Sequence, residues 1–118
     1  MASLKSTYNE QTARCADMFA ALGAEPRLRI VRLLLSAHPD GMVVGELQTE
    51  LDIAGSTLSH HLEKLKNEGL VNVTRESNFL RYRANTESLR ELLTFLYAEC
   101  CTRNKAVEAG EIVRIGAK

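Results

Sequence analysis

Apolar residues return at every third or fourth position through most of the first 70 residues, a spacing typical of amphipathic helices. The pattern predicts helices over about Glu10–Leu22, 26–36, Val44–Leu51 and 54–68. Pro26 suits a first helical turn, and Gly23 and Gly69 suit positions just after helix ends. The side chains expected to face the core are those of Cys15, Ala16, Phe19, Leu22, Leu28, Val31, Leu34, Leu35, Leu47, Leu51, Leu58, Leu62 and Leu65.

After Gly69 the period changes from helical to alternating. Val71 and Val73 alternate with polar residues, which predicts a strand, and Phe79–Ala84 is predicted to form a second one. Residues 76–78, Glu-Ser-Asn, have turn chemistry, so the two strands are expected to form a hairpin.

A last helix is predicted to begin at Thr86, a suitable N-cap. This helix has more apolar surface than the core of so small a domain can bury. We therefore expect Leu92 and Leu96 to meet Ala16 and Phe19 of the first helix across a homodimer interface. The apolar stripe of the last helix consists of Leu89, Leu92, Leu93, Leu96, Tyr97 and Cys100.

The third and fourth predicted helices are joined by a tight connection and followed by the hairpin. This order is typical of a winged helix-turn-helix, whose second helix enters the major groove of DNA. The predicted fold class is mainly α with a small β-hairpin, in the order α-α-α-α-β-β-α. The candidate DNA contacts are Ser56, Thr57, Ser59, His60, His61 and Lys64 on the fourth helix, and Arg75, Arg81 and Arg83 on the hairpin.

Composition restricts the function further. The 118 residues carry no net charge, so any attraction to nucleic acid must be local; residues 54–83 hold five basic and three acidic residues. We expect one domain over residues 1–102 and a flexible tail over 103–118. No apolar run is long enough to span a bilayer and the first residues are not a signal peptide, so we expect a cytoplasmic protein without a membrane partner. We find no nucleophile–base pair, phosphate-binding glycine loop or carboxylate dyad, which argues against an enzyme.

Three stretches of the chain resemble the ArsR/SmtB family of winged-helix metal- and metalloid-sensing repressors. They are Phe19–Ile30, Ser56–Leu62, and Gly69-Leu70-Val71 leading to Tyr82-Arg83, and together they span most of residues 15–90. The resemblance implies a homodimer, formed through the first and last helices, that binds an imperfect palindrome in double-stranded DNA. It also implies that the repressor leaves this operator when its inducer binds.

The chain departs from the family in places that matter for sensing. Gly55 stands where the family often has a polar side chain, and residues 43–45 are Val-Val-Gly where many members have a Cys-x-Cys pair. The last helix has no histidine, so the zinc ligands of the family's zinc sensors are absent as well.

The remaining soft ligands are Cys15, Cys100 and Cys101, an odd number that does not suit a disulfide framework. Thiolates select soft ions, and three of them suit a three-coordinate centre better than tetrahedral zinc. Cys100-Cys101 also resembles the arsenic-sensing branch of the family, whose members carry ligand cysteines at the end of the last helix. We therefore expect trivalent arsenic, as arsenite or methylarsenite, to be the inducer, with Cys15 as third ligand. Adjacent sulfurs reach one ion only if the helix loosens there.

An alternative is a thiol-based redox or sulfide sensor of the same family. Relatives of this kind use cysteines on the first and last helices, which here correspond to Cys15 and Cys100.

Overall fold

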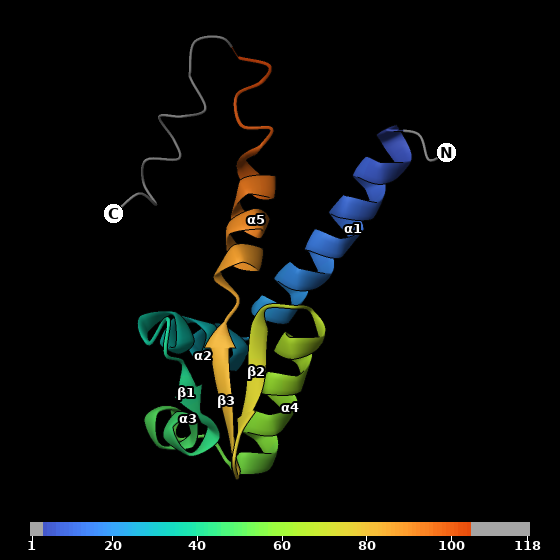
Figure 1. Ribbon diagram of the computed structural model, residues 1–118. Helices are drawn as coiled ribbons and strands as arrows, with labels where there is room; N and C mark the ends of the chain where they lie inside the picture. Colours follow the sequence, from blue (N-terminus) through green and yellow to red (C-terminus); the bar gives the residue numbers. More distant parts are fainter. Residues whose placement is uncertain (1–3, 105–118) are drawn as a thin grey trace.

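The computed structural model describes residues 4–104 and shows a winged helix-turn-helix (Figure 1). Its order confirms the predicted α-α-α-α-β-β-α arrangement and adds one short strand before the third helix. The predicted tail over 103–118 lies outside the described residues from residue 105 onward. The elements are α1 (Leu4–Leu22), α2 (Glu25–Ser36), β1 (Met42–Val43), α3 (Val44–Leu51), α4 (Gly55–Asn67), β2 (Val71–Glu76), β3 (Phe79–Ala84) and α5 (Thr86–Tyr97).

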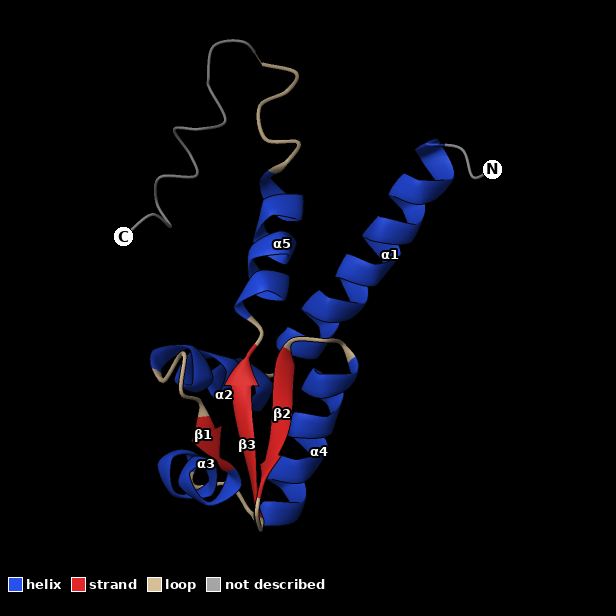
Figure 2. Cartoon of the chain, viewed as in Figure 1, coloured by secondary structure: helices blue, strands red, loops and turns tan. Residues whose placement is uncertain are grey.

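The sheet has three antiparallel strands in the order β1-β3-β2 (Figure 2). Strand β1 was not predicted, because two residues are too few to show an alternating pattern. Its first residue, Met42, pairs with Tyr82 of β3. Gly41 comes just before β1 and has φ +74°, and a Cβ there would overlap the Tyr82 carbonyl. This glycine therefore allows the backbone to come close enough for the strands to pair.

Three predicted helix boundaries were wrong. Helix α1 begins at Leu4, six residues before the predicted start at Glu10, because its first turns lack the apolar spacing on which the prediction relied. The N-cap of α5 is Asn85 rather than Thr86: its side-chain oxygen accepts a hydrogen bond from the Ser88 amide at 3.2 Å. The amide group of Asn85 also donates to the Gly69 carbonyl at 2.9 Å, which ties the base of α5 to the end of α4. Helix α5 ends at Tyr97, so Cys100 follows the helix instead of completing its stripe.

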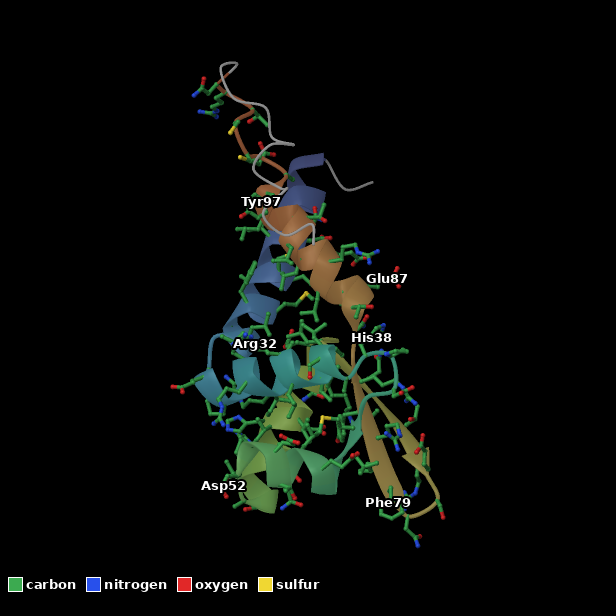
Figure 3. All side chains as sticks on the ribbon, turned by 90° about the vertical axis from the view of Figure 1, so that its left-hand side faces the viewer. Arg32, His38, Asp52, Phe79, Glu87 and Tyr97 are labelled. Carbon is green, nitrogen blue, oxygen red and sulfur yellow. The ribbon has the colours of Figure 1, made fainter. Side chains whose placement is uncertain are left out.

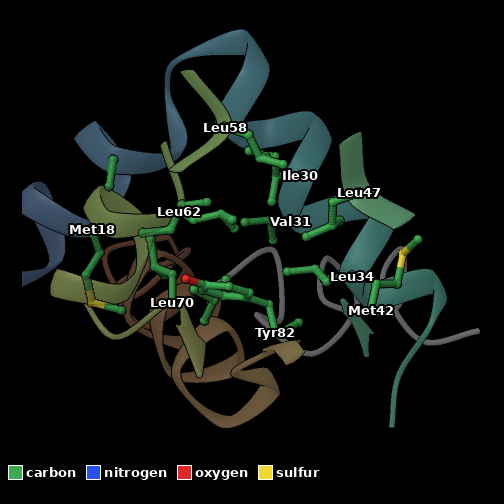
Figure 4. Close-up of a cluster of buried hydrophobic side chains, with 14 of the residues drawn as sticks. Met18, Ile30, Val31, Leu34, Met42, Leu47, Leu58, Leu62, Leu70 and Tyr82 are labelled. Atoms are coloured by element: carbon green, nitrogen blue, oxygen red, sulfur yellow. The ribbon is translucent and has the colours of Figure 1, made fainter. Parts of the chain in front are cut away.

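The core lies where α1–α4 meet the sheet, and Figure 4 shows side chains from all of these elements in contact. On α2 the buried residues are Ile30, Val31 and Leu34. Leu28 and Leu35, which were predicted to face inward, are exposed. The buried face of α2 is therefore rotated from the predicted one.

Helices α1 and α5 extend from this body on the same side and diverge toward their far ends (Figure 1). Leu92 is 1% exposed, so it belongs to the core of its own chain and not to the surplus apolar surface predicted for it. Leu93 and Leu96, by contrast, are 56% and 59% exposed. A hollow of about 610 Å³ lies between the two helices, with Gln11 on one side and Phe95 on the other. Leu93 and Leu96 are therefore apolar surface on α5 that a second subunit could cover.

Candidate DNA interface and thiol pair

Helix α4 is held against α3 by a short, close connection. Helix α3 ends at Leu51, and the C-cap residue Asp52, with φ 54°, turns the chain sharply toward α4. A Cβ on Gly55 would lie 3.1 Å from the Gln48 amide nitrogen, so the first residue of α4 sits directly on α3. The buried face of α4 consists of Leu58, Leu62 and Leu65. Packing of this face leaves the opposite face of α4 exposed.

Five of the six predicted contacts on α4 are exposed. Four of them, which we call the recognition face, lie in its N-terminal half: Ser56, Thr57, Ser59 and His60. These side chains are short and polar, and their hydroxyl and imidazole groups are of the kind that forms hydrogen bonds with base edges and phosphates. Lys64 is also exposed, and it has no ion-pair or hydrogen-bond partner among the described residues. The neighbouring Lys66, by contrast, pairs with Glu63 at 3.5 Å.

His61 does not share the recognition face. It is half-buried, and its Nδ1 is buried without a hydrogen-bond partner among the described residues. Desolvation lowers the pKa of the imidazole, and the positive charge of Arg27 lowers it further. The shift favours the neutral imidazole, and the side chain lies against the protein instead of on the recognition face.

The hairpin of β2 and β3, here called the wing, distributes its three arginines over two faces. Directly opposed residues share a face, and the register pairs Arg75 with Leu80, Thr74 with Arg81 and Asn72 with Arg83. Arg75 is therefore on the face that continues from the core, while Arg81 and Arg83 are on the other. Sequence order alone suggested one basic cluster.

Glu76 offsets part of the positive charge on the face that carries Arg81 and Arg83. Its Oε1 accepts a hydrogen bond from Arg81 Nε at 2.8 Å, and its Oε2 lies 3.8 Å from Arg83 Nη2. Arg83 also donates to the Pro39 carbonyl at 3.2 Å and to the Thr74 hydroxyl at 2.8 Å. Sequence analysis did not identify this role of Glu76, although an acidic residue beside a hairpin turn, within reach of the returning strand, was a readable signal.

Arg75 is the wing arginine that is available to a ligand. It is exposed, and within the described residues it takes part in no hydrogen bond or ion pair. Of the three arginines predicted to contact DNA, it is the one with no carboxylate within ion-pair distance among the described residues.

Cys100 and Cys101, here called the thiol pair, lie in the turns that follow α5. Their Sγ atoms are 3.1 Å apart, and Cys101 has φ 63°, outside the helical region. The loosening required for two adjacent sulfurs to reach one ion is therefore present in the backbone. Hydrogen bonding with the Cys100 thiol raises the pKa of the Cys101 thiol.

Cys15 lies apart from the thiol pair. It is 7% exposed and packs in the core cluster on α1. No three His, Cys, Asp or Glu side chains within residues 4–104 are grouped closely enough to hold a metal ion. The third-ligand role predicted for Cys15 therefore requires that its thiol leave the core or that another copy of the chain supply it.

None of the described helices has the length and apolar character needed to cross a bilayer.

Comparison with known proteins supports the assignment of the interface to DNA. Residues 22–74 match a family described as a helix-turn-helix domain. The chain is 40% identical over 90 residues to the biofilm growth-associated repressor of Agrobacterium fabrum, covering 65% of this chain and 77% of that protein. It is 29% identical over 96 residues to the transcriptional activator HlyU of Vibrio cholerae, covering 81% of this chain and 86% of HlyU.

Solved structures show the same architecture. The structure of HlyU from Vibrio cholerae is 35% identical in sequence and superposes with a TM-score of 0.60, covering 75% of this chain and 97% of that one. An ArsR-like transcriptional regulator from Rhodococcus sp. RHA1 is 27% identical, with a TM-score of 0.61 and 92% of each chain covered. The helix-turn-helix match ends at residue 74, so the thiol pair lies outside it.

Proposed function

Because this chain belongs to the ArsR/SmtB family of winged-helix transcriptional regulators, we propose that it is a homodimeric repressor that releases its operator when trivalent arsenic binds Cys100 and Cys101. The observation that supports this inducer is the 3.1 Å separation of the two Sγ atoms. One of the relatives above is named a repressor and another an activator, so the direction of regulation is part of the proposal.

The thiol pair fits a soft, thiophilic ion. Two sulfurs bind one ion when their separation is less than twice the ion–sulfur bond, which for zinc thiolates is about 2.3 Å. The observed 3.1 Å satisfies this condition without a change of backbone. Both cysteines are also partly exposed, so arsenite has access to them from solvent.

The exchange reaction on the pair is balanced and needs no oxidant. Each cysteine thiol forms an arsenic–sulfur bond, and one arsenic–oxygen bond of arsenous acid breaks for each. The two thiol protons leave with the two hydroxyl groups as water. The third hydroxyl of arsenous acid stays on arsenic unless a further thiol replaces it.

Asn85 offers a route from this site to the DNA-binding surface. Its backbone amide donates to the Leu70 carbonyl at 3.0 Å, and its side chain bonds both the Gly69 carbonyl and the first turn of α5. A tilt of α5 would therefore shift the backbone at the C-terminal end of α4. The shift in operator affinity equals the difference in arsenic affinity between the DNA-bound and released conformations.

The homodimer supplies the geometry through which such a tilt releases DNA. Two recognition helices must lie one helical turn of DNA apart, about 34–36 Å, to enter successive major grooves. Leu93 and Leu96 present an apolar face on α5 that a second copy would cover. A rotation of one α5 against the other would change the spacing of the recognition helices without altering either helix.

The test uses serine variants and a duplex that the wild-type protein selects from a randomised pool. Operator release is followed by fluorescence anisotropy during titration with sodium arsenite, and arsenic binding by intact mass of the free protein. We expect Cys100→Ser and Cys101→Ser to bind the duplex normally but to stay bound at arsenite concentrations that release the wild type. Cys15→Ser is the matched control and is expected to respond like the wild type.

The two readouts separate the possible failures. Release of both Cys100→Ser and Cys101→Ser at wild-type arsenite concentrations would place the sensing site elsewhere. Loss of release in Cys15→Ser alone, with mass evidence of arsenic still bound, would show that a third sulfur transmits the signal.

A further inference from the structure

The tip of the wing carries an exposed aromatic side chain. Phe79, the first residue of β3, is 62% exposed, and the next residue, Leu80, is also exposed. The two lie on opposite faces of the hairpin, because Phe79 pairs with Glu76 and Leu80 with Arg75. Together they give the end of the hairpin apolar side chains on both faces.

This tip lies at the end of the molecule that presents α4. Figure 1 shows the turn between β2 and β3 at the same end of the molecule as the start of α4, and Figure 3 places Phe79 and Asp52 on opposite sides of that end, away from Tyr97. Asp52 belongs to the turn that leads into the recognition face. The apolar tip is therefore at the end of the molecule that presents the recognition face, away from the far end of α5.

The charges beside the tip favour a nucleic-acid partner over a protein one. Arg75 is exposed and unpaired within the described residues, and it shares a face with Leu80. The Glu76 carboxylate is already paired with Arg81, whose Nε lies 2.8 Å from Oε1. One available positive charge beside two apolar side chains matches a groove whose walls are phosphates and whose floor is stacked bases.

We propose that Phe79, supported by Leu80, enters the minor groove beside the major groove occupied by α4 and wedges into a base step, so that the protein bends its operator. Apolar wedges of this kind unstack the step partly and kink the duplex away from the minor groove. Arg75 holds the hairpin in place by contacting phosphate. The proposal rests on DNA binding by the family fold and does not depend on arsenic.

The experiment measures bending and unstacking without arsenite. A selected duplex carries a donor and an acceptor dye at its ends to report bending, and 2-aminopurine at each step that flanks the recognition half-sites to report unstacking. We expect the wild type to shorten the end-to-end distance and to raise 2-aminopurine fluorescence at one flanking step. Phe79→Ala is expected to lose both signals and to bind about tenfold more weakly, as for loss of an aromatic stacking contact.

Two further variants serve as controls. Phe79→Trp keeps an aromatic wedge and is expected to retain bending, while Leu28→Ala removes an exposed apolar side chain from α2 and is expected to change nothing. The inference is overturned if Phe79→Ala bends and unstacks the duplex like the wild type. It is also overturned if Phe79→Ala alters only sedimentation, which would show that the tip contacts another protein copy. Absence of binding to any duplex by the wild type would refute DNA recognition itself, and this outcome is distinct from binding without bending.

Discussion

Removing the charge of Glu76 is expected to strengthen operator binding and to make it more sensitive to salt. Glu76 holds Arg81 at 2.8 Å and lies 3.8 Å from Arg83, so it offsets part of the positive charge of the wing. In Glu76→Gln, Arg81 loses its ion-pair partner. Arg83 stays anchored by the Pro39 carbonyl and the Thr74 hydroxyl, so one arginine per subunit is released.

The magnitude follows from counterion release. Each added phosphate contact steepens the slope of log Kobs against log salt by about 0.9. One new contact by Arg81 in each subunit of a dimer therefore steepens the slope by about 1.8. Between about 0.2 M and 0.05 M salt the variant should gain about twelvefold more affinity than the wild type gains. The exposed ion pair contributes little to folding, so the melting temperature should hardly change.

The assay is a salt series of binding isotherms for the wild type, Glu76→Gln and Glu87→Gln. Glu87 is exposed on the first turn of α5, so its replacement makes the same change of net charge away from the wing. A steeper slope for Glu76→Gln alone supports the reasoning. An unchanged slope would show that the freed arginine does not reach phosphate, and weaker binding would show that Glu76 holds the wing in its binding conformation.

Three further predictions concern other parts of the molecule. Ser59→Ala and His60→Ala should each weaken binding to the selected duplex by about 1–3 kcal/mol and relax the sequence preference of the protein, measured by anisotropy on matched and altered duplexes. If both variants kept the wild-type specificity, the assignment of α4 to the major groove would be wrong. Leu96→Glu should shift the sedimentation coefficient to that of a monomer, whereas Leu28→Glu should not. Because the pKa of His61 is lowered on folding from an ordinary 6.5, the unfolded chain binds the proton more tightly, so the contribution of His61 to thermal stability should be constant well above that pH and fall below it. His61→Gln should reduce this loss, and an identical pH profile would exclude His61 as its cause.

The helices and the wing were predictable because their residues are patterned by burial. Leu58, Leu62 and Leu65 return at helical spacing, and Val71 and Val73 alternate, so each element was recognised from its own sequence. The same spacing also predicts where His61 lies, because it is three residues after Leu58 and four before Leu65. It therefore falls on the buried side of α4, unlike its neighbour His60.

The charge distribution of the wing could not be read from the identity of its residues. Whether Arg75, Arg81 and Arg83 act together depends on the strand register, which decides the face of each side chain. The register also brings Glu76 within reach of two of them. Tertiary geometry, and not composition, therefore decides which positive charge is available.

The end of α5 was mispredicted for a different reason. Cys100 continues the apolar stripe of the helix, and no glycine or proline lies between Tyr97 and Cys101 to signal a stop. The helix nevertheless ends at Tyr97, and Cys101 takes a left-handed conformation. Beyond Leu92 no residue of α5 is fully buried, so tertiary packing does not enforce a longer helix.

The distance of the thiol pair from the packed body has an evolutionary consequence. Residues 98–101 contribute no side chain to the hydrophobic core, and they lie outside the helix-turn-helix match. Substitutions there encounter few packing constraints, so if the thiol pair senses the inducer as proposed, a descendant of this gene could exchange one inducer for another by a handful of changes in this segment. The operator it reads would be inherited intact, and a duplicated copy could acquire a new signal before it acquired a new set of target genes.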